Sequence, residues 1–321
     1  MKELYIKDLG VGTQINKGLF MVKNIMGKKD RNGKDYMDVV LGDMTGEVSG
    51  KVWNEAIARQ PYILDIKETT ICEIDAKVQE YLGKPQLNIV GMRIASSEDY
   101  DMGDFVRKAP EESEAMFAYL NGVASSFDDE DLKKLCMRFL SENRERLMYY
   151  PAASKNHHAE YGGLLYHTKR MLMNGERMCE VYTNLNRDLL LAGVILHDAE
   201  KLNEIESGED GIATGYSFEG QMLGHIIMGV KSLDRWCLEI GMPYEKRIML
   251  EHMILSHHYE PEFGSPKKPL FPEAEILHYL DIIDARMYDM EMALEGVGNG
   301  QWSEKVWTLD NRKIYKPEGE E

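Results

Sequence analysis

Histidine is absent from the first 150 residues of this chain, and one histidine stands beside an aspartate at the end of an apolar run. All nine histidines follow residue 150. The run LLLAGVILHDAEKL, residues 189–202, is apolar over its first eight residues and then ends in His197, Asp198 and Lys201. An ionised carboxylate in apolar surroundings costs on the order of several kcal/mol unless a charged partner compensates it. The sequence therefore predicts that Asp198 either reaches the surface or lies against a strong partner.

Four further histidines and one aspartate stand in or beside similar apolar helical segments. They are His167 after GGLLY, His225 in LGHIIMG, His257 and His258 after MILS, and Asp281 in LHYLDIID. A single histidine on an apolar helix is more often a core or surface residue than a ligand. Several such groups from different helices would lower the cost of their burial together if they converged on metal ions.

The donor set predicts a site for two divalent ions. Imidazoles and carboxylates without thiolates suit Mn, Fe, Co or Zn, and Mg is a further candidate. Asp198 is the candidate bridge, because a carboxylate can span ions roughly 3.5–4 Å apart. One ion would be completed by His167, His197 and Asp281, and the other by His225, His257 and His258. Lys201 follows Asp198 by three residues and could neutralise a phosphate oxygen; the alternative is a solvated helix end.

Length, charge and cysteine content bound the class of protein. A chain of 321 residues predicts two domains. The net charge of −17 argues at first against a nucleic-acid partner, but it is unevenly placed. Residues 1–100 hold 14 basic and 15 acidic side chains, and residues 101–321 hold 24 and 40. We expect a cytoplasmic protein without a membrane span, because no long apolar run or signal peptide is evident and the four cysteines are widely separated.

Hydrophobic periodicity divides the chain near residue 100. Before residue 96 apolar residues alternate, as in YMDVVLGD and TICEIDAKVQEY, which predicts about five strands in a small barrel or sandwich. The polar segment 96–114 is typical of a linker. Helical spacing follows, at 127–147, 164–182, 189–202, 220–241, 244–259 and 273–296. The expected fold class is multidomain α and β, a β-barrel followed by an all-α bundle.

The ordered His and Asp residues resemble the HD-domain phosphohydrolases. His167, His197-Asp198 and Asp281 match the motif of that superfamily, and the additional His225 and His257-His258 resemble its two-metal members. The segments around YYPAASKNHHAEYGGLLYHT, HDAEK, ILSHHY and ILHYLDIIDARM, with the preceding barrel and NRKIYKP near the end, resemble the bacterial YhaM-type 3′→5′ exoribonucleases. The resemblance covers nearly the whole chain. It implies an OB-fold nucleic-acid-binding domain at 1–98, a linker at 99–114, an HD domain at 115–296 and a tail at 297–321.

The resemblance also has two departures and one further implication. Tyr166 and Glu200 stand where the family commonly has Glu in LLEHT and Gly in HDxGK. Glu200 would add negative charge beside a phosphate site and could slow the enzyme or change its metal preference. His157 and His158 match family positions and could contact substrate phosphate or donate a proton, which makes His158 a catalytic candidate. A surface pair of loop imidazoles is the alternative.

The barrel segment KGLFMVKNIMGKKDRNGKDYMDVVLGDMTGEVSGKVW is similar to the first three strands of OB domains, which bind single strands across one sheet face and its loops. Alternation places Tyr36 opposite the core, Lys51 with Trp53 on one strand face, and Lys77 with Tyr81 on another. Stacking of a base on such a ring contributes about 1–3 kcal/mol and tolerates any base. Exposed strand faces often carry Tyr and Lys without any ligand, so this assignment is a hypothesis.

A basic loop, GKKDRNGK, adds candidate phosphate contacts next to these strands. Its basic residues are Lys28, Lys29, Arg31 and Lys34. These charges could follow a phosphate backbone with weak, salt-sensitive affinity. A lysine-rich turn that is only solvated is the alternative.

By resemblance, the expected reaction is manganese-dependent removal of nucleotides from the 3′ end of single-stranded RNA, with DNA as a further possible substrate. Two alternatives stay open at this point. One is a nucleotide or cyclic-dinucleotide phosphohydrolase, and the other is a non-catalytic nucleic-acid-binding regulator.

Overall fold

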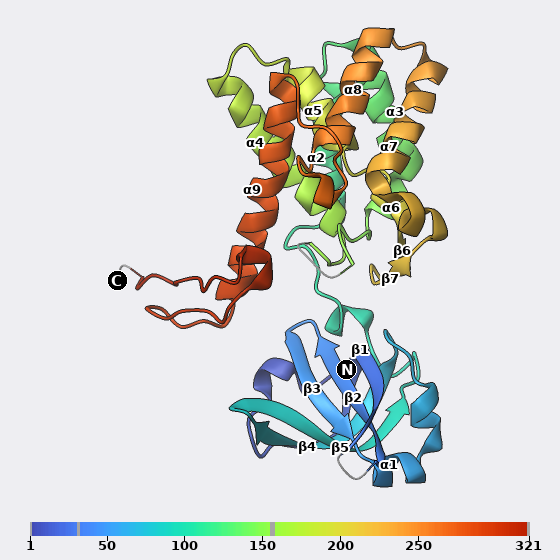
Figure 1. Cartoon of the computed structure of the whole chain (residues 1–321), viewed down its shortest axis with the longest axis vertical. Coiled ribbons are helices and arrows are strands. Elements are labelled where there is room, and N and C mark those ends of the chain that lie inside the picture. The colour runs from blue at the N-terminus through green and yellow to red at the C-terminus, as the bar shows by residue number, and fades with distance from the viewer. Residues whose placement is uncertain (1, 31–32, 155–157, 320–321) are drawn as a thin grey trace. The chain divides into compact units, whose positions relative to one another are not determined.

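The chain forms two compact units, Met1–Lys108 and Ala109–Glu321, in this computed structural model (Figure 1). The structure describes residues 2–30, 33–154 and 158–319. The division between the units falls inside the segment 99–114 that was expected to be a linker. Each unit has a hydrophobic core of its own.

The first unit is a closed five-stranded barrel, as the alternating sequence pattern predicts. Its strands are β1 (Gln14–Lys29), β2 (Asp35–Asp43), β3 (Gly46–Val52), β4 (Ile71–Tyr81) and β5 (Lys84–Ile94). They are paired in the order β1-β2-β3-β5-β4, and β3 and β5 are parallel. The helix α1 (Asn54–Arg59) connects β3 towards β4. This closed, OB-like barrel confirms the predicted fold of the first unit.

Strand alternation explains the two surfaces of the barrel. On β2, Met37, Val39 and Leu41 are buried in the core, while Tyr36 and Asp38 point away from it. A one-residue shift of register would exchange the two faces, so the apolar pattern fixes the pairing. The turn between β4 and β5 is formed by two residues with positive φ, 51° at the first and 78° at the second, which is a glycine.

The second unit is helical, as predicted. Its helices are α2 (Ser113–Ser125), α3 (Glu130–Leu147), α4 (Gly163–Val181), α5 (Arg187–Leu196), α6 (Lys201–Glu204), α7 (Phe218–Ile240), α8 (Tyr244–Ser256) and α9 (Pro272–Leu294). A short hairpin of β6 (Ile205–Ser207) and β7 (Ala213–Tyr216) lies between α6 and α7. The sequence analysis missed α2 and this hairpin. Helix α2 does carry a helical apolar pattern, at Met116, Phe117, Leu120, Val123 and Ala124.

Helix α5 is the central element of this unit. Every residue from Leu189 to Leu196 is buried. Its N-terminus is capped by the side chain of Asn186, which accepts from the Leu189 N–H, and α4, α8 and α9 pack around it (Figure 1). The helix ends at Leu196, and four residues separate it from Lys201, where α6 begins, so the predicted continuous helix to residue 202 is interrupted by a turn. His197 and Asp198 therefore lie in this turn, at the C-terminal end of the buried helix α5.

The segment after α9 is largely irregular. It contains the 3₁₀ turn η5 (Trp307–Leu309) and two isolated bridges, and Arg286 of α9 pairs with Asp310 at 2.7 Å. Among residues 2–30, 33–154 and 158–319, no helix combines the length and apolar character that crossing a membrane requires.

Candidate metal centre and nucleic-acid face

The fold brings all seven predicted metal ligands to one place in the helical unit. They come from the ends or interiors of five helices: His167 of α4, His197 and Asp198 after α5, His225 of α7, His257 and His258 at the end of α8, and Asp281 of α9. Asp198 is 3 % exposed. The sequence left two alternatives for Asp198, exposure at the surface or burial against a partner. The structure shows the second.

One half of the cluster surrounds Asp198 Oδ2. His197 Nε2 lies 3.1 Å from this oxygen and His167 Nε2 lies 3.8 Å from it. The two Nε2 atoms are 3.4 Å apart, and Asp281 Oδ1 is 3.4 Å from His167 Nε2. These four residues are the set that the sequence analysis assigned to the first ion.

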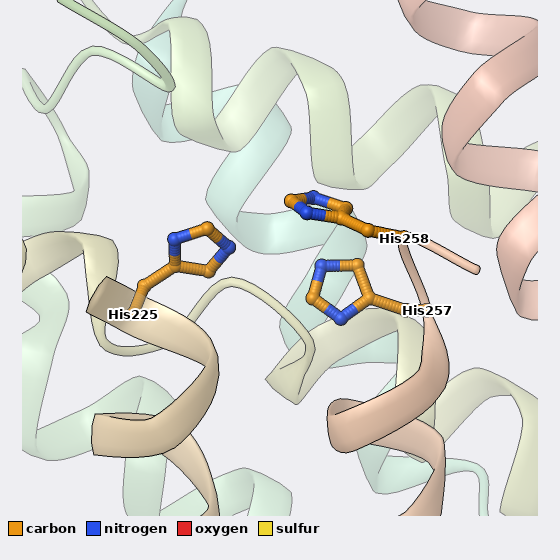
Figure 2. Close-up of side chains that lie close together, drawn as sticks. All are labelled: His225, His257 and His258. Carbon is orange, nitrogen blue, oxygen red and sulfur yellow. The ribbon is translucent and has the colours of Figure 1, made fainter. Parts of the chain in front are cut away.

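The other half surrounds Asp198 Oδ1. Its distances to His225 Nε2 and His257 Nε2 are 3.4 and 4.0 Å. Figure 2 shows His225 on one helix and His257 with His258 at the end of another, with their rings turned towards a common space. The His258 Nε2 lies 3.8 Å from Asp281 Oδ2. Asp198 and Asp281 thus each direct one carboxylate oxygen to the first half of the cluster and the other oxygen to the second half.

Each histidine of the cluster is oriented through its Nδ1 atom. Three donate to main-chain carbonyls, His197 to Val194, His257 to Ile254 and His258 to Phe263, at 2.8, 2.7 and 2.7 Å. A carbonyl can only accept, so Nδ1 carries the proton and the lone pair remains on Nε2. The other two, His167 and His225, direct Nδ1 to carboxylates. All five histidines therefore present Nε2 to the cluster, as metal-ligating histidines do.

Buried donor atoms that lack a hydrogen-bond partner also indicate that the cluster fits divalent cations. Among the described residues, Asp198 Oδ1, His225 Nε2 and His257 Nε2 are buried and have no hydrogen-bond partner. Buried polar atoms normally find a partner, and unsatisfied ones are costly. These three atoms face one another, so a cation between them would satisfy all three at once.

The electrostatics of the cluster keep the acids ionised. Burial raises the pKa of Asp198, but the neighbouring His197 and the charge of Lys201 outweigh it and hold that pKa well below its usual range. Burial lowers the pKa of His257 well below its usual range, and the neighbouring imidazoles act in the same direction. At Asp198 and His257 this is the protonation state in which a carboxylate and an imidazole bind metal. Burial lowers the pKa of His167, but its contacts with Asp281 and Asp284 outweigh burial and raise that pKa to about 9.

Lys201 is held beside the shared carboxylate. Its Nζ lies 2.7 Å from Asp198 Oδ2, although the continuous helix expected to place it there is replaced by a turn. Burial lowers the pKa of Lys201, but the charge of Asp198 and the hydrogen bond to it raise it above the usual value. The side chain therefore remains a cation next to the cluster.

A break in α7 positions His225. Gly224 has φ 70° and ψ 159°, which is not helical and is a region almost restricted to glycine. The break frees the His225 main-chain N–H, which donates to Glu204 Oε1 at 2.9 Å. The same carboxylate accepts from His225 Nδ1, with Oε2 at 3.0 Å. The orientation of the His225 imidazole therefore depends on the backbone conformation of Gly224 and on the carboxylate of Glu204.

The structure places His158 beside the cluster, in contact with Asp284. This residue is fully buried, and its Nε2 lies 2.8 Å from Asp284 Oδ2, on the Nδ1 side of His167 and so behind the cluster. Its ring shares one oxygen of Asp284 with His167, and the expected role of His158 as a phosphate contact or proton donor stays a prediction. The neighbouring His157 lies outside the described residues.

The two family departures lie close to the site without joining it. Glu200 is buried, and its carboxylate accepts from Asn203 Nδ2 at 2.8 Å. Tyr166 packs edge-on against the His158 ring, at 5.4 Å between centroids, and the guanidinium of Arg170 lies over the Tyr166 ring, 5.3 Å from its centroid. Tyr166 therefore packs among the groups behind the ligands.

The sequence analysis missed two acids that contact the ligands, Glu204 and Asp284. Asp284 follows Asp281 by three residues on α9, so helical spacing puts both on one face. That spacing inside an apolar helix was a usable signal. For Glu204 no such signal existed, because its contact with His225 depends on the break at Gly224.

On the barrel, three of the predicted nucleic-acid contacts form one surface group. The rings of Tyr36 and Trp53 have centroids 5.3 Å apart, and Lys51 Nζ lies 4.4 Å from the Tyr36 centroid. Trp53 is 39 % exposed. An amine over adjacent aromatic rings on an outward face is the combination that binds bases and phosphates of single strands. We call these three residues the aromatic group.

The strand register extends the aromatic group across the sheet. Asp38 pairs with Lys51, Lys51 with Asn88, and Asn88 with Lys77, so polar side chains form one row over β2, β3, β5 and β4. Tyr81, 56 % exposed, lies four residues beyond Lys77 on the same face of β4.

The basic loop is matched by acids in this structure. Lys28 pairs with Asp38 at 2.6 Å, and Lys29 and Lys34 lie 3.8 Å from Asp35 and Glu55 respectively. Arg31 lies outside the described residues. Exposed pairs of this kind contribute little, about 0–1 kcal/mol each, so phosphates could replace the acids at low cost.

Comparison with known proteins agrees with this architecture. The family model described as HD domain matches residues 164–286, a range that contains all seven clustered ligands. A relative from Oceanobacillus iheyensis named 3′-5′ exoribonuclease YhaM is 37% identical over 309 residues, covering 95% of this chain and 94% of the relative. One of the same name from Bacillus subtilis (strain 168) is 36% identical over 308 residues, covering 96% of each.

Proposed function

The chain belongs to the family of YhaM-type 3′→5′ exoribonucleases with an HD domain, and we propose that it trims single-stranded RNA from the 3′ end with two divalent ions, preferably Mn²⁺. The observation that carries the two-ion part is the position of Asp198, whose two oxygens face two separate groups of imidazoles. Two divalent ions in such a site supply Lewis acidity to a phosphodiester and make water a better nucleophile.

The residues of the chain then have distinct tasks. His167, His197, Asp198 and Asp281 would hold one ion, and His225, His257 and His258 the other. Lys201, fixed as a cation beside Asp198, would neutralise charge that develops on the phosphate during cleavage. The aromatic group and the basic loop would hold the strand without selecting its sequence. Stacking and phosphate contacts do not read the 2′-hydroxyl, so single-stranded DNA should also bind.

A direct assay tests this proposal. A 5′-labelled oligoribonucleotide incubated with the protein and Mn²⁺ should give a ladder shortened from the 3′ end, with 5′-mononucleotides released. The matching DNA oligonucleotide should be degraded or at least compete. If free nucleotides or cyclic dinucleotides are hydrolysed and the oligonucleotides are not, the assignment of the substrate is wrong.

Substitution of the shared carboxylate tests the site. Asp198→Ala should lose both bound metal and activity, while the barrel stays folded. Glu206→Gln, which neutralises an exposed acid of the same unit, is the matched control and should keep both. Metal content is read by elemental analysis of protein purified without chelator. Full activity of Asp198→Ala would exclude the cluster as the catalytic site.

A further inference from the structure

Two of the five histidines in the cluster are backed by carboxylates, one on each side of Asp198. His167 Nδ1 lies 2.8 Å from Asp284 Oδ2, and His225 Nδ1 lies 3.0 Å from Glu204 Oε2. The remaining three histidines use carbonyls of the main chain, which side-chain substitution cannot remove. Asp284 and Glu204 are therefore the partners of the histidines that can be changed by substitution.

Asp284 is itself held by three groups. Besides His167, its Oδ2 contacts His158 Nε2 at 2.8 Å, and its Oδ1 is ion-paired with Arg170 Nε at 2.6 Å. Behind His158, Glu160 is buried; its Oε1 lies 3.6 Å from His158 Nδ1. Arg170 follows His167 by three residues on α4, so one helix supplies both the ligand and the cation that fixes its acid.

The same residues could be read as a third cation site, because His158, His167 and Asp284 have ligand atoms that lie together. Two observations favour a hydrogen-bonded layer instead. One oxygen of Asp284 is at hydrogen-bond distance from both rings, and its other oxygen is already paired with a guanidinium. A cation placed there would also meet the positive charge of Arg170.

Glu204 performs the equivalent task for the second half. It accepts from both the main-chain N–H and the Nδ1 of His225, so it fixes the ring and the backbone break at Gly224 together. Its side chain is 12 % exposed, which makes it easier to substitute than the buried Asp284.

We infer that Asp284 and Glu204 are positioning residues that aim His167 and His225 separately, so the two halves of the metal centre can be weakened one at a time. His158 and Arg170 act through Asp284 and do not touch substrate. This inference rests on the proposed metal centre. Carboxylates behind metal-bound histidines typically contribute about 10- to 100-fold in metal affinity.

The test is Mn²⁺ binding to the full chain, followed by the electron paramagnetic resonance signal of free Mn²⁺. Asp284→Asn and Glu204→Gln keep the shape of each acid and remove its charge. Each should weaken one of two sites by about 10- to 100-fold and leave the other within a few-fold of the parent protein. Glu273→Gln is the control, because it neutralises a buried acid of α9 that accepts from the Asn186 main-chain N–H and contacts no ligand; it should bind like the parent.

Rescue by metal separates positioning from catalysis. RNA hydrolysis by Asp284→Asn and by His158→Gln should recover when Mn²⁺ is raised, because only the occupancy of the site has fallen. A loss at saturating Mn²⁺ would instead make His158 a participant in the reaction and overturn its assignment. If Asp284→Asn does not fold, Glu204→Gln and Arg170→Gln, on less buried side chains, carry the same test.

The outcomes distinguish the inference from the proposed function. Parent protein that binds two Mn²⁺ ions without cleaving RNA would refute the nuclease assignment while the binding data still decide the roles of the two acids. Wild-type-like binding by both variants, or equal losses in Glu273→Gln, would refute the positioning roles. A third bound ion that is lost in Asp284→Asn would replace the hydrogen-bonded layer by a metal site. Absence of any bound metal in the parent would overturn both conclusions.

Discussion

At the scale of single residues, Lys201 is the most informative position in the helical unit. It is the one predicted catalytic residue whose side chain the structure places directly on the shared carboxylate, 2.7 Å from Asp198 Oδ2. A cation that is held in a buried site of low dielectric constant stabilises developing negative charge more effectively than a cation exposed to water does.

We expect Lys201→Met to lower kcat by about 100- to 1,000-fold at saturating Mn²⁺ and RNA, since that is the usual loss when one such electrostatic contact is removed. Lys201→Arg should retain part of the activity because it keeps the charge. Initial rates over a range of RNA concentrations measure the effect. Lys231→Met, which removes an exposed lysine of α7, is the control and should be neutral. A defect confined to KM would show that Lys201 only binds the strand.

On the barrel, the aromatic group predicts a measurable loss of RNA affinity. Trp53→Ala should weaken binding of single-stranded RNA by about 1–3 kcal/mol, or roughly 5- to 150-fold, if a base stacks on the ring. Fluorescence anisotropy with labelled RNA in the absence of Mn²⁺ reports binding without cleavage. Tyr62→Ala, which removes another exposed aromatic side chain of the same unit, should bind normally. Equal losses in the two variants would argue against a specific stacking site.

At the scale of elements, the break in α7 links backbone strain to the site. Gly224→Ala puts a β-carbon on a residue with φ 70° and ψ 159°, although the space around it is open, with Glu204 Oε1 the closest atom at 3.7 Å. The cost is therefore conformational, about 1–3 kcal/mol.

We expect Gly224→Ala to lower the thermal stability of the helical unit and to weaken Mn²⁺ binding, since relief of the strain would turn His225 away from Asp198. Calorimetry and Mn²⁺ titration measure the two effects. Gly122→Ala is the matched control, because Gly122 is helical in α2 and a β-carbon there meets nothing within 4 Å. A variant that loses stability but binds Mn²⁺ normally would show that the break does not aim the imidazole.

The N-terminus of α3 predicts a pH dependence. Asp129 caps this helix by accepting from the N–H groups of Asp131 and Leu132, and it pairs with Lys246 at 2.7 Å. Burial raises the pKa of Asp129, but these partners outweigh it and lower the pKa below its usual value. An acid with a lowered pKa in the folded state stabilises the protein above its unfolded pKa, about 3.9, and the contribution is lost as pH falls through the folded value.

Asp129→Ala should therefore cost about 1 kcal/mol at neutral pH and progressively less below about pH 4. Urea denaturation followed by far-UV circular dichroism, which reports mainly the helical unit, measures this difference. Asp128→Ala, at the exposed neighbouring position, is the control. A cost for Asp129→Ala that stays constant down to pH 3 would mean that the loss is one of packing and not of the charged cap.

At the scale of the whole molecule, the two units have separate cores and contrasting charge. The barrel core and the helical core share no residue, and the acidic excess lies in the helical unit. The near-neutral barrel therefore repels a phosphate backbone less than the acidic helical unit does.

Residues 1–108 and 109–321 should each fold when produced alone. The first fragment should bind single-stranded RNA with an affinity that falls as salt is raised, and the second should bind Mn²⁺ and cleave RNA with a raised KM. Circular dichroism, anisotropy and initial rates of the two fragments measure these properties. An unchanged KM of the helical fragment would show that the barrel does not capture substrate.

The sequence predicted what depends on local pattern and failed where tertiary contacts decide. Alternation of Met37, Val39 and Leu41 was enough for the barrel, because one buried face fixes a strand. The seven clustered His and Asp residues could be predicted to converge because each stands in apolar surroundings that it would otherwise destabilise. The role of Glu204 and the buried position of His158 could not, since both depend on which segments face one another after folding.

The ion pair between Lys201 and Asp198 has a consequence for the order in which the protein folds and binds metal. The Lys201 ammonium group balances the charge of the Asp198 carboxylate within the protein itself, so we expect the helical unit to fold without added divalent ions. The folded protein would then bind its ions afterwards, and its rate of RNA hydrolysis would follow the concentration of free divalent ions.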